Sequence, residues 1–132
     1  MKLGLIQMRA REDKEESLAL AEKYIASAAK MGADIVMLPE MFNCPYSTEN
    51  FRTYAEPEGG PSWTRMAEAA RRNKVYLVAG SMPEYLEAGN RIVSDRSAHV
   101  FNTSYVFDRD GKQLAKHRKM HLFDINVRGG QY

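Results

Sequence analysis

The strand predicted at residues 34–38 constrains the fold most, because its core from Ile35 to Leu38 is apolar without alternation. A continuous apolar run of this length is typical of a strand covered on both faces of a parallel sheet. Before it, residues 13–31 carry apolar side chains at helical spacing, and residues 2–8 predict another strand. A strand, a helix and a strand joined this closely predict a parallel pair and an α/β fold.

The rest of the chain predicts further alternation and then an antiparallel end. Residues 108–111 (Asp-Arg-Asp-Gly) are typical of a hairpin turn between two strands. The expected segments are a loop with room for one helical turn at 41–60, a helix at 61–73, a strand at 75–81, a polar surface excursion at 84–97, strands at 99–107 and 112–117, and a loop at 128–132.

Length and composition limit the class of protein. The 132 residues correspond to one domain, and the net charge of +2 implies neither nucleic acid nor membrane as a partner. A single cysteine cannot form an internal disulfide, which favours a reducing cytoplasm. No apolar run reaches the length of a membrane span, and the apolar part of the amino terminus is too short for a signal peptide.

Two charged residues are candidates for catalysis. Glu40 follows a buried strand and a proline, at the edge where open α/β sheets collect ligands. It is either a solvated carboxylate or a general base whose charged form is disfavoured by partial burial. Lys119 ends the basic run 116–119, which is either a solvated face or a strand that alternates, with Lys119 and His117 on one side and Arg118 on the other. An inward lysine would stabilise an oxyanion.

Other chemistry is not favoured. Cys44 lies in a loop before Pro45, which has no backbone N–H for an oxyanion hole, so we expect a half-buried structural cysteine rather than a nucleophile. His117 and His121 are four apart, but the two cations that follow His117 oppose a metal. There is no phosphate loop and no cofactor motif. RNA contact through the basic run is a weak alternative.

Glu40 and Lys119 lie in segments that resemble the nitrilase superfamily of carbon–nitrogen hydrolases. The first is 38–42 (Leu-Pro-Glu-Met-Phe) with Pro-Tyr at 45–46, and the second is 117–124 (His-Arg-Lys-Met-His-Leu-Phe-Asp). Residues 80–84 (Gly-Ser-Met-Pro-Glu) and 101–104 (Phe-Asn-Thr-Ser) are similar to further landmarks of the family. The resemblance covers the whole chain and is closest to omega-amidase-like members.

The resemblance implies a function and a fold. Residues 1–132 would be the amino-terminal portion of a hydrolase domain, half of a four-layer α-β-β-α sandwich completed by a carboxyl-terminal half or by self-association. Glu40 would be the general base, Lys119 the oxyanion-stabilising cation and Tyr46 a substrate contact. The family's nucleophilic cysteine and second glutamate would follow Tyr132, and no cofactor or metal is implied. The substrate would be a small linear amide.

The chain departs from the family pattern in three ways. The nucleophile motif is missing, residues 88–98 are longer than usual, and His117 replaces a common tyrosine. We therefore expect this chain alone to be inactive. The alternatives are a half-protein that needs a partner chain and a non-enzymatic remnant that binds a carboxylate or nucleic acid through Lys116, Arg118 and Lys119.

Overall fold

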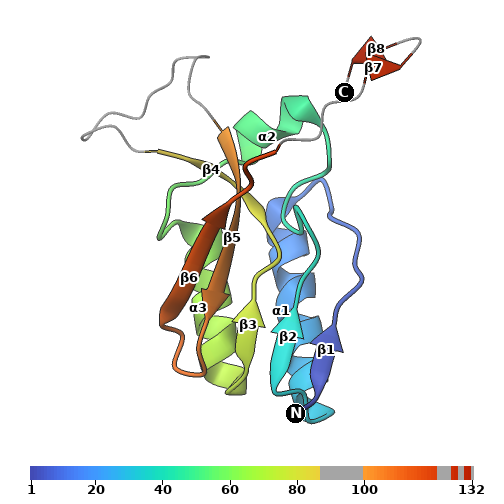
Figure 1. Cartoon of the computed structure of the whole chain (residues 1–132). Helices are drawn as coiled ribbons and strands as arrows, with labels where there is room; N and C mark the ends of the chain where they lie inside the picture. Colours follow the sequence, from blue (N-terminus) through green and yellow to red (C-terminus); the bar gives the residue numbers. More distant parts are fainter. Residues whose placement is uncertain (87–99, 122–125, 128–129, 132) are drawn as a thin grey trace.

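The computed structural model describes residues 1–86, 100–121, 126–127 and 130–131. Its main sheet has six strands: β1 (Leu3–Leu5), β2 (Ile35–Met37), β3 (Tyr76–Val78), β4 (Met82–Tyr85), β5 (Val100–Phe107) and β6 (Gln113–Arg118). Strands β1, β2 and β3 are parallel, and β5 pairs antiparallel with β3, β4 and β6. The predicted α/β fold with an antiparallel end is confirmed (Figure 1).

Helices α1 (Lys14–Lys30) and α3 (Pro61–Asn73) lie on the same face of this sheet (Figure 1). Helix α1 begins one residue after its predicted start, because the side chain of Asp13 accepts the Glu15 N–H as an N-cap, and α3 begins at Pro61 as predicted. Leu18, Ile25 and Met66 from the helices pack on the inward side chains of the central strands. This single interface holds most of the apolar core.

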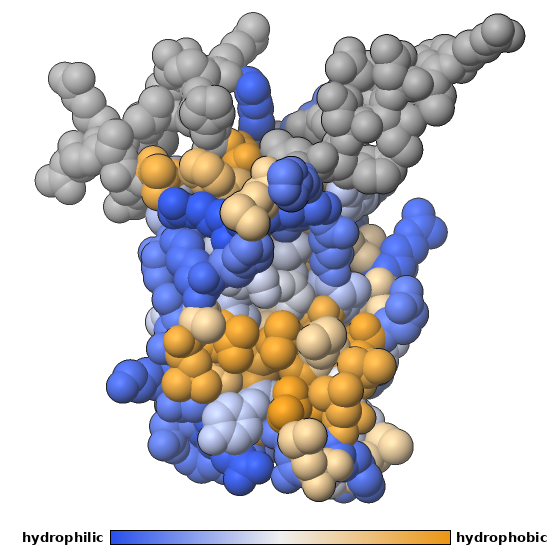
Figure 2. All heavy atoms as spheres, in the orientation of Figure 1, coloured by the Kyte–Doolittle hydropathy of each residue, from blue (hydrophilic) through white to orange (hydrophobic). Residues whose placement is uncertain are grey.

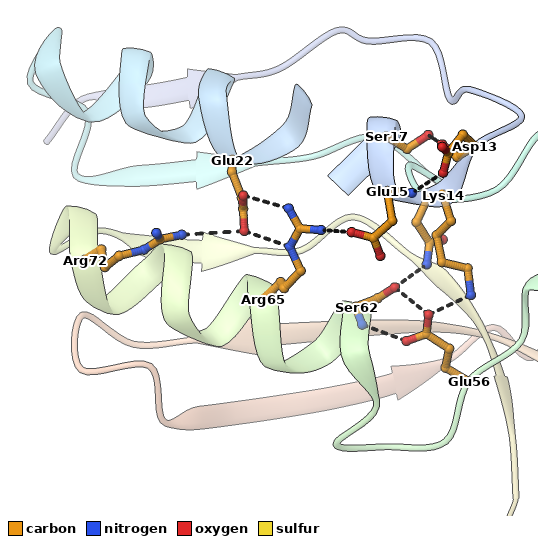
Figure 3. A network of polar contacts seen from close by, with 10 residues as sticks. Asp13, Lys14, Glu15, Ser17, Glu22, Glu56, Ser62, Arg65 and Arg72 are labelled. Atoms are coloured by element: carbon orange, nitrogen blue, oxygen red, sulfur yellow. Dashed lines mark hydrogen bonds and ion pairs between the residues drawn. The ribbon is translucent and has the colours of Figure 1, made fainter. Parts of the chain in front are cut away.

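A polar network joins the outer surfaces of the two helices (Figure 3). Arg65 of α3 makes paired hydrogen bonds to Glu22 of α1, at 2.9 and 2.8 Å. Lys14 of α1 binds the carboxylate of Glu56 at 2.6 Å, and the same carboxylate accepts the Ser62 N–H at the start of α3. These contacts fix α1 and α3 against each other above the sheet.

Among the residues that the structure describes, no helix covers the opposite face of the sheet. Leu3, Leu5, Met37 and Tyr76 are exposed there, whereas Val36 and Leu77 face the helices and are buried. Figure 2 shows an apolar patch on this face of the molecule, over the strands. An exposed apolar patch of this kind is typical of a surface that packs against another layer or chain.

Three segments differ from the sequence prediction. Residues 48–54 form a short helix, α2 (Thr48–Tyr54), in the predicted loop, and two short strands, β7 (Asn126–Val127) and β8 (Gly130–Gln131), pair near the carboxyl end. Residues 82–85 form β4, although 84–97 was expected to be a surface excursion. The sequence of β4 does not look like a strand, because it contains a proline and a glutamate, and Glu84 is buried through its pairing with cations far away in the sequence. Residues 87–97 of that excursion lie outside the described residues.

Candidate active site

Glu40 and Lys119 meet, although 79 residues separate them in the sequence. Lys119 Nζ lies 2.9 Å from Glu40 Oε1, and both side chains are partly open to solvent, at 36% and 47%. Glu40 comes three residues after Met37, the last residue of β2, and Lys119 directly follows β6. The hydrogen bond to Glu40, together with its negative charge, raises the pKa of Lys119, so the lysine is a cation at neutral pH.

A third residue joins this pair. Asn102 of β5 donates its side-chain amide to Glu40 Oε1 at 2.6 Å, and its backbone carbonyl accepts the Lys119 N–H at 2.8 Å. Sequence reasoning included Asn102 in a family landmark but assigned no role to it. The pairing of β5 with β6 brings it next to Lys119, and Glu40 reaches it from the turn after β2.

The alternation predicted for the basic run is confirmed. His117 and Lys119 line one side of β6, at a hollow of about 380 Å³ that Glu40 also lines. Lys116 and Arg118 point the other way, to the buried carboxylate of Glu84. Since these cations and Lys119 are all paired with carboxylates, the run offers little surplus positive charge for a nucleic-acid phosphate.

Backbone contacts hold the turn that carries Glu40. The Met41 N–H binds Ser81 Oγ at 3.1 Å, and Met41 itself has a positive φ of 51°. Gly80 passes so close to the turn that a Cβ there would lie 2.0 Å from the Pro39 carbonyl oxygen. A strained residue held by surrounding contacts next to a carboxylate is typical of functional sites.

Cys44 is buried rather than half-buried, with 1% of its surface exposed. Burial raises the pKa of its thiol to about 11, although the charge of nearby Lys14 opposes the effect. Its Sγ makes only a weak contact, 3.4 Å from the Pro45 carbonyl oxygen. A buried, protonated thiol is a poor nucleophile, which supports the expectation that Cys44 does not attack substrate.

Tyr46 lies on a groove of about 780 Å³ that runs from Glu40 past the loop at residues 8–13. Its ring is exposed and packs edge-on against Phe51, with centroids 5.2 Å apart. This position suits a substrate contact. In the described part of the chain, no group of three or more His, Cys, Asp or Glu side chains could hold a metal ion.

The protein belongs to the carbon–nitrogen hydrolase family, whose profile matches residues 2–132. The chain is 42% identical over 128 residues to mouse omega-amidase NIT2, covering 97% of the chain and 43% of that protein. It is 44% identical over 126 residues to nitrilase homolog 2 of Dictyostelium discoideum, covering 96% of the chain and 36% of that protein. It thus spans less than half the length of these relatives.

Solved structures agree on the fold. Nit3 of Saccharomyces cerevisiae, a member of the nitrilase superfamily, superposes with a TM-score of 0.77 at 32% identity, covering 99% of this chain and 53% of that one. The helix layer and sheet layer described above therefore correspond to part of a nitrilase-type fold. Among the residues that the structure describes, no helix is both long and apolar enough to cross a membrane.

Proposed function

We propose that Glu40 supplies the general base and Lys119 the oxyanion-stabilising cation of an amidase that hydrolyses a small linear amide. The observation that carries the proposal is the 2.9 Å contact between Glu40 and Lys119 at the edge of a hollow. The name of the mouse relative supports an ω-amide as substrate, in which the amide is at the far end of a short carboxylic acid. Tyr46, on the adjoining groove, would contact the substrate.

The nucleophile in this proposal is a cysteine outside these 132 residues. Glu40 takes the thiol proton as sulfur bonds to the amide carbon, and the carbonyl electron pair moves to oxygen beside the Lys119 ammonium. Collapse of this intermediate breaks the C–N bond, and Glu40 returns the proton to the leaving nitrogen, which departs as ammonia. Water then adds to the thioester with Glu40 again as base, which frees the acid and the thiol.

The test is ammonia release from small ω-amides of dicarboxylates by the full-length product of the gene. Glu40→Gln removes the base and Lys119→Ala removes the cation, and each should lower kcat by about 10²–10⁴-fold. The matched controls Glu49→Gln and Lys23→Ala change exposed helix residues and should stay within about twofold. Undiminished activity in both site variants would refute the proposal.

A second proposal concerns the open sheet face. Its exposed apolar side chains, and the relatives' greater length, favour cover by a second sheet from a carboxyl-terminal part. Without this cover the chain would be an inactive half. Native mass spectrometry of the 132-residue chain tests it: we expect self-association, or a complex when a carboxyl-terminal half is added. A stable, well-dispersed monomer that does not bind the added half would contradict this second proposal.

A further inference from the structure

Asn102 contacts both members of the Glu40–Lys119 pair. Its amide nitrogen lies 2.6 Å from Glu40 Oε1, the oxygen that Lys119 Nζ also binds. Its carbonyl oxygen accepts the Lys119 backbone N–H at 2.8 Å. We infer that Asn102 is a positioning residue that aligns the Glu40 carboxylate with the Lys119 ammonium, a role that rests on the proposed function.

The location of Asn102 suits it to this task. It lies in the middle of the sheet, because β5 pairs with β4 on one side and with β6 on the other, and it is only 8% exposed. Glu40, by contrast, is in a turn with nearly half of its side chain open to water. A donor on a rigid strand that binds a carboxylate on an open turn restricts the turn more than the strand.

The chemistry of the amide matters as well as its place. An Asn side chain is neutral and does not exchange protons with a carboxylate, so it orients Glu40 without competing for the proton. Both donors, the Asn102 amide and the Lys119 ammonium, bind Oε1. Neither occupies Oε2, so that oxygen can serve as the one that accepts the thiol proton.

Two substitutions at this position should separate alignment from overall stability. Asn102→Ala removes the donor and leaves Glu40 free to turn toward water, and Asn102→Asp keeps the shape but replaces the donor with a negative charge. In the full-length product we expect kcat to fall about 10²-fold or more in both, as for a misplaced catalytic group, with KM changed less than about threefold. The matched control is Asn73→Ala on α3, whose amide donates to the Ala69 carbonyl within its own helix.

A second readout distinguishes positioning from a structural role. Competitive acylation of lysines, followed by mass spectrometry, reports the pKa of Lys119. Asn102→Ala should move that pKa back toward the ordinary lysine value, because Glu40 leaves the lysine, whereas Asn102→Asp should raise it further by adding a negative charge nearby. A structural role would produce no such opposite shifts.

The outcomes are distinct. Loss of activity in Glu40→Gln with full activity in both Asn102 variants overturns this inference and leaves the proposed function standing; full activity in Glu40→Gln overturns the proposed function itself. If the Asn102 variants do not fold, the amide ¹⁵N and ¹H shifts of Asn102 decide. They should change between the unsubstituted protein and Glu40→Gln, and identical shifts would overturn the inference.

Discussion

Glu84 should contribute a large part of the stability of the β4–β5–β6 region. Its carboxylate is 2% exposed. It accepts hydrogen bonds from Arg118 Nε at 2.9 Å, Arg118 Nη2 at 3.0 Å and Thr103 Oγ1 at 2.7 Å, and it also binds the Lys116 ammonium. Burial alone would raise the pKa of Glu84, but these donors outweigh it and lower the pKa from 4.5 to about 2.

The lowered pKa gives the size of the effect. A carboxyl whose pKa falls from 4.5 to about 2 on folding stabilises the folded state by about 3 kcal/mol at neutral pH, at about 1.4 kcal/mol for each tenfold change. Glu84→Gln keeps the shape and removes the charge. Since Lys116 and Arg118 are 22% and 34% exposed and can turn to water, we expect a loss of about 2–3 kcal/mol.

Urea unfolding of the full-length product at several pH values measures this loss. Because the folded pKa is the lower one, the stabilisation is complete above the unfolded pKa near 4.5 and disappears as the pH falls toward 2. The gap between the parent protein and Glu84→Gln should therefore shrink over that range. The control is Glu58→Gln, which removes an exposed partner of Lys116 and should cost under about 1 kcal/mol. A Glu84→Gln cost equal to the control, or one independent of pH, would refute the reasoning.

Three further substitutions are informative, of which the first tests the contact between Gly80 and the turn after β2. Gly80→Ala combines a positive φ with a Cβ 2.0 Å from the Pro39 carbonyl oxygen, and should cost more than about 3 kcal/mol in thermal or urea unfolding. Gly59→Ala, at a positive φ with open space around it, should cost only about 1 kcal/mol; equal costs would contradict the role of the close approach. Cys44→Ala should lose about 1–2 kcal/mol of stability and retain ammonia release, and a folded but inactive variant would contradict the conclusion that Cys44 is not the nucleophile.

Regular local patterns made much of the fold predictable. The strand β2, helices α1 and α3 and the hairpin from β5 to β6 each have their own apolar period, cap or turn residues in the sequence. The strand β4 has no such pattern. It is stabilised by partners more than 30 residues away, Lys116 and Arg118 for Glu84, and no local window of sequence contains them. Helix α2 is short, and the side chain of its N-cap residue Ser47 makes no capping hydrogen bond.

For the site, the sequence could identify individual residues but not how they come together. Glu40 and Lys119 each lie in a distinctive segment, so the sequence could nominate them, but their approach depends on how β6 is registered against β5. The contribution of Asn102 was not predictable, because its amide contact spans 62 residues.

The two faces of β5 explain why this register is fixed. Asn102 and Thr103 are neighbours and therefore point to opposite sides of the sheet. Asn102 holds Glu40 on the open side, while Thr103 binds Glu84 on the other side, where Glu84 also holds Arg118. A slip of one residue would exchange the faces of the whole strand, so it would bury the wrong side chains and break the Glu84 contacts together. The buried ion pairs on one face thus fix the register on which the Glu40–Lys119 contact on the other face depends.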